Sequence, residues 1–354
     1  MSKPSGPLSA MLFARFQGKM SFPDVSLAGR TVLITGANGG LGLETARHFA
    51  TLSPSRLVLA VRRVAAGETA ADEISKSTGL ARSKIEVWEL DLASFAGVKA
   101  FGTRAKEELE RLDIACLNAA VAGFRWDQTA DGWERMLQVN AIPTGLLSVE
   151  LLPLLLETAD LLAPAGVPAL KPHLAIVASD VHFWTKFSEL KAYKSGKASS
   201  ILSALNDKKL YNSTDRYNVS TLLNVFLVRE LAALPTVRGK VVVTTPNPAF
   251  TQSSLLREAP WPVASLFPLL ARPTAESAKV LVYGSLVDTT TSDPEGAFIH
   301  HCKVIDPAPL VLSEGGREVS RKVMEEVKAV RTEVDEEAVR AVSYGREQGE
   351  EKDE

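Results

Sequence analysis

The sequence predicts an α/β protein built on buried parallel strands. Two observations carry this prediction: short apolar, largely β-branched runs alternate with stretches of helical periodicity, and the first run opens into a glycine-rich turn. The chain has 354 residues, of which 45% are hydrophobic and 23% charged. That is enough for one large α/β domain or two small ones.

The glycine-rich turn lies within residues 31–42, TVLITGANGGLG. Thr31–Thr35 has the pattern of a buried strand, and Leu43–Thr51 carries apolar residues at helical spacing. Between them, Gly36, Gly40 and Gly42 follow the spacing GxxxGxG. Glycines let the backbone turn tightly and approach a pyrophosphate, which the free N–H groups of the helix N-terminus then face. This segment therefore predicts a phosphate-binding turn.

Further strands and helices alternate along the chain. Strands are expected at 56–61, 84–90, 112–117, 173–178, 240–245 and 296–300. Helices are expected at 65–77, 95–109, 132–155, 216–234 and 274–286, and at 198–210 within the polar stretch 186–212. Residues 123–130 and 159–172 have the composition of loops, and residues 316–354 that of a mostly solvated, charged helix with a frayed acidic end.

Two arginines, Arg62 and Arg63, follow the second strand. An adenosine ribose with a free 2′-hydroxyl is usually held by an acidic residue about 20 residues past the glycines, and this count from Gly42 leads to Arg62. A cation at that position can pair with a 2′-phosphate instead. The sequence therefore favours NADP over NAD as the cofactor.

Thr35 and the glycines complete the motif TGxxxGxG, which resembles the short-chain dehydrogenase/reductase family, most closely its retinol-dehydrogenase-like and fungal members. The resemblance covers about residues 28–310. It implies a doubly wound Rossmann fold, an α/β fold whose seven parallel strands take the order 3-2-1-4-5-6-7. Residues 1–27 are then an N-terminal leader, 250–273 a substrate lid, and 311–354 a charged C-terminal helix with an acidic tail.

The resemblance also assigns residues to the cofactor. Those that hold the pyrophosphate are Gly36, Asn38, Gly40, Leu41 and Gly42. Those that contact adenine, ribose or nicotinamide are Arg62, Asp91, Leu92, Asn118, Ala119, Tyr217 and Thr251. Two turns carry alanine where the family has glycine, Ala120 and Ala249. Alanine at 120 demands a negative φ or some strain.

Three catalytic residues follow from the same resemblance. Ser179 ends the fifth strand and hydrogen-bonds the reacting oxygen, Tyr217 transfers the proton, and Asn140 holds a water in the proton relay. The family's central motif is YxxxK, whose lysine holds the nicotinamide ribose and lowers the pKa of the tyrosine by its charge. In this chain the lysine position is occupied by Thr221.

A second match to YxxxK lies earlier, at Tyr193–Lys197 (YKSGK). Gly196 and the polar surroundings make this stretch a poor core helix. Tyr217 instead lies in an apolar, core-type helix, at the family's distance before Pro248. Tyr217 is therefore assigned as the catalytic tyrosine.

The missing lysine leaves two function hypotheses. Losing an acid–base assist of this kind typically costs ~10²–10⁴ in rate. The first hypothesis is an NADP-dependent oxidoreductase that interconverts a carbonyl and an alcohol on a hydrophobic small molecule, with fungal secondary metabolism as a plausible setting by resemblance. The second is a repurposed family member that binds NADP but acts as a non-redox catalyst or a regulator.

Composition bounds the other function classes. The formal net charge of −2 gives no sign of a nucleic-acid partner. The five histidines show no spacing typical of metal ligands, and no apolar run reaches the length of a membrane span. The two cysteines fit a reducing compartment, so a cytoplasmic protein is expected.

Two questions of assembly stay open at the level of sequence. Residues 1–27 are interpreted as a loosely packed leader, with an amphipathic arm on a membrane surface or a partner as the alternative. Family members often pair through the helices that carry Asn140 and Tyr217. The polar insertion before Tyr217 alters this surface, so the sequence does not decide the oligomeric state.

Overall fold

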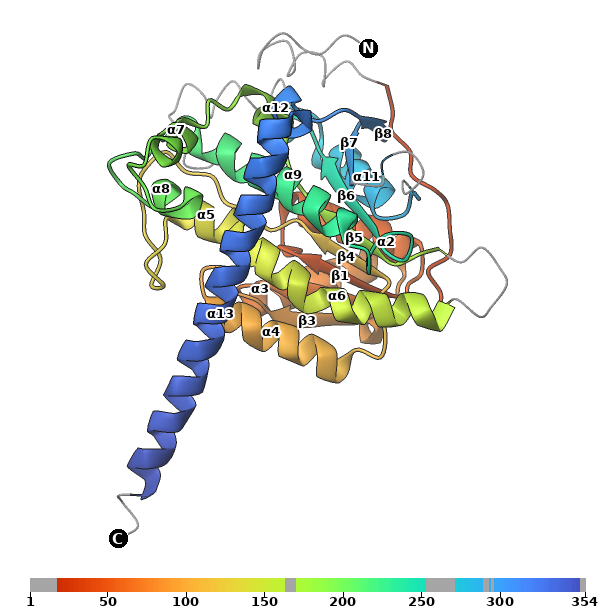
Figure 1. Ribbon diagram of the computed structural model, residues 1–354. Helices are drawn as coiled ribbons and strands as arrows, with labels where there is room; N and C mark the ends of the chain where they lie inside the picture. Colours follow the sequence, from red (N-terminus) through yellow and green to blue (C-terminus); the bar gives the residue numbers. More distant parts are fainter. Residues whose placement is uncertain (1–17, 163–169, 253–270, 289–292, 294–295, 351–354) are drawn as a thin grey trace.

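The computed structural model describes residues 18–162, 170–252, 271–288, 293 and 296–350, and the side chains within these ranges as far as residue 333. Most of the expected lid, residues 253–270, lies outside the described residues, as do residues 1–17 of the expected leader. The chain forms a three-layer α/β fold with one sheet between two layers of helices (Figure 1).

One eight-stranded sheet forms the middle layer, in the order β3-β2-β1-β4-β5-β6-β7-β8. Its strands are β1 (Thr31–Thr35), β2 (Arg56–Val61), β3 (Ile85–Glu89), β4 (Ile114–Leu117), β5 (His173–Ile176), β6 (Val242–Asn247), β7 (Ala297–His300) and β8 (Lys303–Ile305). The first seven run parallel, which confirms the predicted doubly wound order. Parallel strands end at one edge, so residues that follow β1, β4, β5 and β6 gather there.

Strand β8 was not predicted. It pairs antiparallel with β7 across a two-residue turn, in which His301 and Cys302 have φ of 51° and 55°. Two left-handed residues in succession match the right-handed twist of a hairpin. The sequence signal was absent because this turn usually carries asparagine, aspartate or glycine.

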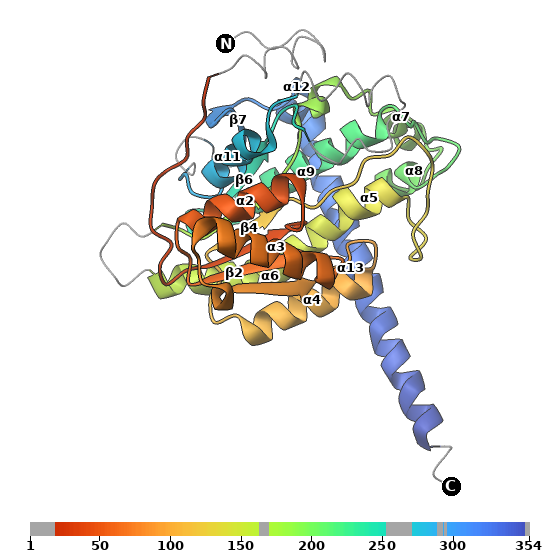
Figure 2. The same cartoon turned by 180° about the vertical axis from the view of Figure 1, so that it is seen from behind.

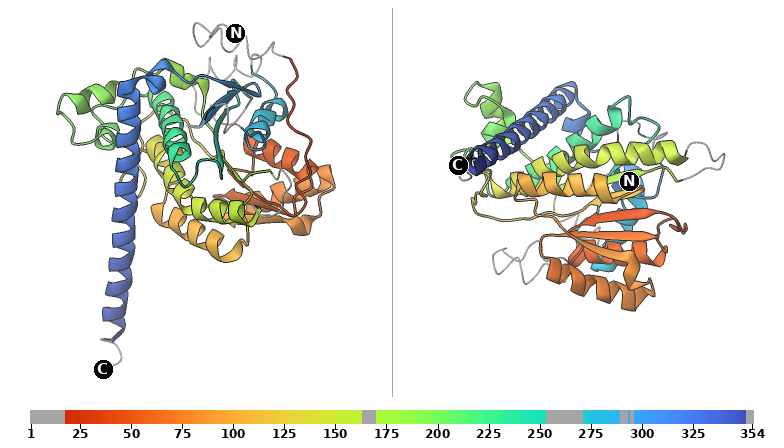
Figure 3. Two further views of the ribbon diagram at one scale, coloured as in Figure 1. Left: turned by 45° about the vertical axis from the view of Figure 1, so that its right-hand side comes forward. Right: turned by 90° about the horizontal axis from the view of Figure 1, so that it is seen from below.

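The helices that cover the sheet are α2 (Gly40–Thr51), α3 (Val64–Thr78), α4 (Phe95–Glu108), α5 (Arg135–Asn140), α6 (Ile142–Leu162), α9 (Arg216–Ala233) and α11 (Thr274–Gly284). Helices α2, α3 and α11 pack on one face, and α4, α6 and α9 on the other. Figure 2 shows the first group in front, and Figure 3 shows the sheet between the two layers.

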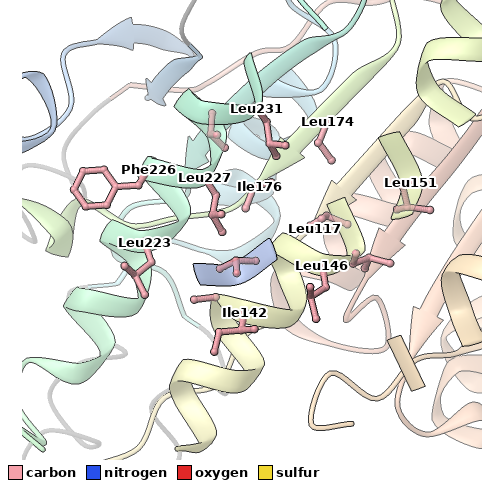
Figure 4. Packing of buried hydrophobic residues seen from close by; sticks show 14 of the residues in the cluster. Leu117, Ile142, Leu146, Leu151, Leu174, Ile176, Leu223, Phe226, Leu227 and Leu231 are labelled. Carbon is pink, nitrogen blue, oxygen red and sulfur yellow. The ribbon is translucent and has the colours of Figure 1, made fainter. Parts of the chain in front are cut away.

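The larger core lies under α6 and α9. Figure 4 shows leucines and isoleucines of both helices meeting side chains of β4 and β5, among them Leu146, Leu227, Leu117 and Ile176. These four are at most 5% exposed. Full burial of such a side chain stabilises the fold by about 1.5–3 kcal/mol each, so this face anchors the helix that carries Tyr217.

The expected helix at 132–155 is two helices that break at Ala141. Helix α6 continues through Pro153 to Leu162, beyond the start of the loop expected at 159. Residues 135–161 are long and apolar enough to cross a membrane, yet 78% of their most apolar window is buried inside the protein. This stretch is therefore a core element.

The polar insertion folds differently from the single helix expected at 198–210. It forms two short helices, α7 (Ser188–Lys194) and α8 (Ile201–Leu205). Gly196, with φ of 73°, ends the first, and the Ser200 capping box begins the second. These local caps outweigh the weak helical periodicity.

The C-terminal segment contains α12 (Pro309–Leu312) and the long α13 (Glu314–Glu350). Its first half is packed rather than solvated: Val319, Val323, Val327 and Val330 are at most 7% exposed and lie against α9 and α6. Their three- and four-residue spacing makes one apolar stripe. The far end of α13 projects away from the body (Figure 1).

Candidate active site

The glycine turn joins β1 to α2 at the carboxyl edge of the sheet. Gly36 and Gly40 have φ of 69° and 54°, the left-handed region that glycine adopts without steric cost. A Cβ at position 42 would lie 2.2 Å from the Gly36 carbonyl oxygen, so only glycine fits there. The N-cap, Gly39, makes no side-chain capping bond, and the first turn of α2 has no acidic residue. The N–H groups of this helix end are therefore available to an anion.

The end of β1 is tied to the end of β4. The Thr35 hydroxyl accepts hydrogen bonds from the Asn118 and Ala119 backbone N–H groups, at 2.9 Å each. The Asn118 side chain donates back to the Thr35 carbonyl at 3.0 Å. Ala120 keeps a negative φ, as expected, so the missing glycine leaves this turn unstrained.

The remaining cofactor positions of the sequence analysis lie at the ends of β2 and β3. Arg62 and Arg63 are exposed, and neither side chain forms a hydrogen bond or ion pair within the described residues. Asp91 folds onto its own turn, since Oδ1 accepts from the Ala93 N–H at 2.9 Å. Leu92 is buried. Asn38 and Leu41, in the glycine turn, are partly exposed.

Ser179 follows β5 and is the N-cap of a short 3₁₀ helix, η3 (Asp180–Trp184). Its Oγ accepts from the Val181 N–H at 3.4 Å and donates to Asp180 Oδ1 at 3.2 Å. Its carbonyl is bonded to His182 Nδ1 at 2.7 Å, and His182 Nε2 accepts from the Ala308 N–H at 3.0 Å. Because Nε2 accepts, Nδ1 carries the proton. Burial lowers the pKa of His182 to about 4, so this neutral ring braces the Ser179 loop.

Tyr217 lies in the first turn of α9, and α9 packs against η3. Burial raises the pKa of the Tyr217 phenol well above 10, and the negative charge of Asp180 raises it further. No cation among the described residues lowers it. The buried Thr221 hydroxyl donates to the Asn218 carbonyl of its own helix at 2.9 Å. Position 221, where the resemblance predicts the lysine, therefore carries a neutral side chain turned onto the backbone.

Asn140 ends α5 and joins three elements. Its Oδ1 accepts from the Val121 N–H, and its Nδ2 donates to the Val121 carbonyl, both at 2.8 Å. The second Nδ2 hydrogen goes to Ser220 Oγ at 3.1 Å, and Ser220 Oγ donates to the Tyr217 carbonyl at 2.8 Å. Both amide hydrogens are thus engaged by protein groups. Asn140 braces the loop after β4 against the turn that carries Tyr217.

The alternative tyrosine–lysine pair does not share a helix. Tyr193 lies in α7, which ends at Lys194, and Gly196 then takes a left-handed conformation before the exposed Lys197. A YxxxK pair acts from one helical face, with side chains four residues apart. This geometry favours Tyr217 over Tyr193.

A buried ion cluster fixes the start of α9. Arg216 directly precedes Tyr217 in the sequence and is fully buried. Its guanidinium lies 3.1 Å from the Glu189 carboxylate of α7 and 3.6 Å from that of Glu134. Glu134 also caps α5 through the Met136 and Leu137 N–H groups. Buried charged side chains therefore join the polar insertion to α9.

The turn after β6 contains strain. Ala249 has φ of 58°, a left-handed value, and its N–H donates to Asn247 Oδ1 at 2.8 Å. The Thr251 hydroxyl bonds the carbonyls of Pro248 and Ala249, at 3.1 Å each. The sequence identified this position as the family's glycine, and the backbone here keeps the glycine conformation.

Ala249→Gly is expected to raise the free energy of unfolding by about 0.5–1 kcal/mol, because relief of left-handed strain exceeds the entropy that glycine adds to the unfolded chain. Urea unfolding measures this change in the free energy of unfolding. Ala120→Gly is the matched control: φ is negative there, so the same change should cost about 0.4–1 kcal/mol. Equal effects of the two substitutions would contradict the strain at Ala249.

Sequence reasoning gave no role to Asp180 or His182. Asp180 directly follows Ser179, and His182 lies three residues on. The only signal was this proximity to Ser179, because the hydrogen bonds of both residues depend on the fold around them.

Comparisons with known proteins agree with this arrangement. A family model described as short chain dehydrogenase matches residues 30–160. The chain is 40% identical to the short chain dehydrogenase sol3 of Alternaria solani, over 78% of this chain and 90% of that protein. It is 33% identical to the short-chain dehydrogenase/reductase dmxR8 of Cryptosporiopsis sp. (strain 8999), over 89% and 94%.

Solved structures share the fold. A protein of Shigella flexneri 2a str. 301, described as a short-chain dehydrogenase and complexed with NADP, superposes with a TM-score of 0.55. The match is 20% identical and covers 78% of this chain and 98% of that one.

Proposed function

This chain belongs to the short-chain dehydrogenase/reductase family, and we propose that it is an NADP-dependent oxidoreductase acting on a carbonyl or alcohol of a hydrophobic small molecule. Family membership supports oxidoreductase chemistry. The observation that carries the proposal is that the glycine turn, Ser179 and Tyr217 lie at one edge of the sheet.

Different residues at this edge would bind the cofactor and act on the substrate. The α2 N-terminus and the glycine turn would hold the pyrophosphate, while Asp91, Asn118 and Thr251 would line the path of the dinucleotide. The bound nicotinamide supplies or accepts a hydride. Ser179 would orient the substrate oxygen, and Tyr217 would exchange a proton with it. Asn140 would keep Tyr217 in position through Ser220.

Arg62→Asp is expected to reverse or abolish a preference for NADPH over NADH. A charge-assisted hydrogen bond to the 2′-phosphate contributes roughly 1.5–3 kcal/mol, which corresponds to about tenfold or more in affinity. The exposed Arg62 has no competing carboxylate among the described residues. Fluorescence titration with both dinucleotides gives the two dissociation constants.

Two variants make this test specific. Arg317→Asp, on the exposed face of α13, makes the same change of charge away from the glycine turn and should leave the preference unchanged. Arg63→Asp shows which arginine of the pair contacts the phosphate. Equal affinity of the wild type for NADH and NADPH would contradict the proposed contact between Arg62 and the 2′-phosphate.

The biological role of the reaction is inferred from the relatives of this chain. The named relatives are fungal short-chain dehydrogenases, which supports a role in fungal secondary-metabolite biosynthesis. A cytoplasmic location fits the two free cysteines, of which Cys116 is buried. The apolar 253–270 segment, with Trp261 and Phe267, fits a hydrophobic substrate.

A second candidate is a family member that binds NADP without redox turnover. The neutral Thr221 and the raised pKa of Tyr217 favour it. Steady-state NADPH oxidation against a panel of ketones and aldehydes, beside a binding titration, separates the two candidates. Turnover supports the oxidoreductase, and tight binding with no turnover in either direction supports the second candidate.

A further inference from the structure

A carboxyl group lies beside the two proposed catalytic hydroxyls. Asp180 Oδ1 is 3.2 Å from Ser179 Oγ, and its charge reaches the Tyr217 phenol. Among the described residues Asp180 forms no ion pair. The family's cation is replaced at position 221 by a threonine that bonds its own helix.

Asp180 is half-buried, so its carboxylate is less well solvated than that of a free aspartate. Burial raises the pKa of Asp180, and the bond from Ser179 and its own backbone N–H offset this only in part. The titratable group that feels its charge is the Tyr217 phenol from α9, which is neutral near neutral pH. His182, two residues along in η3, is bonded to the Ser179 carbonyl and is neutral as well. The site therefore favours the neutral, protonated carboxyl group more than water does.

We propose that Asp180 is the proton donor of this site, passing its proton to Ser179 as Ser179 protonates the substrate oxygen. The 3.2 Å contact, in which Ser179 Oγ donates to Asp180 Oδ1, reverses when substrate is bound: the protonated carboxyl group donates to Oγ, and Oγ donates to the substrate oxygen. The inference rests on the proposed carbonyl reduction and assigns a residue to it. Tyr217, with its phenol held neutral, then serves mainly as a hydrogen-bond donor to the same oxygen. Asp180 takes over the acid function that the absent lysine would otherwise have supported in the tyrosine.

A reduced nicotinamide bound at the glycine turn would supply a hydride, which is one hydrogen with two electrons, to the carbonyl carbon. The C=O π pair moves to oxygen, which takes the proton of Ser179 Oγ. Ser179 Oγ takes the proton of Asp180, and Asp180 is left as a carboxylate that water reprotonates before the next turnover. The carbonyl is reduced to the alcohol and the dinucleotide is oxidised.

Asp180→Asn tests this directly, because the amide keeps the size of the neutral acid and removes its transferable proton. For carbonyl reduction we expect kcat to fall by about 10²-fold, the lower end for loss of a general acid, with KM nearly unchanged. The wild-type kcat should fall as pH rises through the raised pKa of Asp180, and this limb should be missing in the variant. Asp180→Glu, which restores a carboxyl group, should recover part of kcat and the limb.

Infrared difference spectroscopy detects the proton on the Asp180 carboxyl group in the absence of turnover. The wild type at neutral pH should show the C=O band of a protonated carboxyl group that Asp180→Asn lacks.

The pH dependence of stability gives a third readout. Because the folded state holds the Asp180 proton more tightly than the unfolded chain, the stability of the wild type relative to Asp180→Asn should decline as pH rises through the folded pKa. Asp127→Asn, on an exposed carboxylate of the loop after β4, is the matched control and should change none of these.

The outcomes separate the two levels of the proposal. No carbonyl reduction by the wild type overturns the proposed function, and with it this step. An active wild type with an ionised Asp180 at neutral pH, or an Asp180→Asn variant with unchanged kcat and pH profile, overturns the inference alone.

Discussion

Thr221→Lys is expected to raise kcat for carbonyl reduction at least tenfold and to move the basic limb of its pH profile downward. Position 221 lies one helical turn from Tyr217, so the two side chains share a face of α9. A cation close to an acid typically lowers its pKa by about 1–3 units. The phenol, whose pKa is now raised by burial and by Asp180, would become a competent acid. Steady-state kinetics across pH measures both effects.

The substitution also bears on Asp180. Lysine at 221 would stabilise the Asp180 carboxylate and return the acid function to Tyr217. Thr221→Lys should therefore restore activity to Asp180→Asn, and Tyr217→Phe should abolish this rescue. Thermal melting is the check on folding, since Thr221 is buried. Unchanged or lower kcat would contradict this prediction and would mean that the site is tuned around threonine.

Tyr193→Phe is the matched tyrosine control. Tyr193 lies in α7 of the insertion and is partly buried against the core. Its loss should cost some packing and leave kcat within a few-fold. If this variant proved inactive while Tyr217→Phe retained activity, YKSGK would be the catalytic pair after all.

The strands were readable from sequence because a buried parallel strand is apolar on both faces and bounded by turn residues. Strands β1 and β2 begin and end where the pattern placed them, at Thr31–Thr35 and Arg56–Val61. Strand β8 was missed because residues of the type of His301 and Cys302 rarely take the left-handed conformation of this turn. The break at Ala141 has a sequence signal that the prediction did not use: Pro143 has no N–H to continue the helix and is tolerated in the first turn of a new one.

In the candidate site, too, some features could be predicted from the sequence and others could not. Residues at strand ends, such as Ser179 and Asn118, could be placed because the topology brings strand ends together. The state of Asp180 could not, since it depends on burial and on neighbours from α9. Likewise, the partners of Asn140 come from a loop and a helix far apart in the chain.

The C-terminal helix was misjudged for another reason. Its many charges predicted a mostly solvated helix, and the valine stripe did not enter that prediction. Yet Glu326 accepts from the N–H groups of Ile201 and Leu202 at the start of α8, at 3.0 and 2.7 Å. Part of its charge therefore serves as a cap for a neighbouring helix rather than as a solvated surface.

Val327→Asp is expected to destabilise the protein by about 3–5 kcal/mol, the cost of an unpaired buried charge. Val327 is 2% exposed and lies where three helices meet. A Cβ at Gly145 of α6 would be 3.1 Å from its Cγ1 and 3.3 Å from Leu227 of α9. No space remains for water at this contact, so the carboxylate must either break the packing or drive α13 off α9 and α6. Urea unfolding measures the loss.

Lys328→Asp, one residue along on the exposed side of the same helix, is the matched control and should change stability by less than about 0.5 kcal/mol. Release of α13 from the Val327→Asp variant would uncover the apolar faces of α6 and α9, so self-association on size-exclusion chromatography should accompany the loss of stability. Hydrogen exchange should also rise along α9, and kcat should fall with it because Tyr217 depends on that helix. A Val327→Asp protein as stable as Lys328→Asp would show that the first half of α13 does not pack on the body.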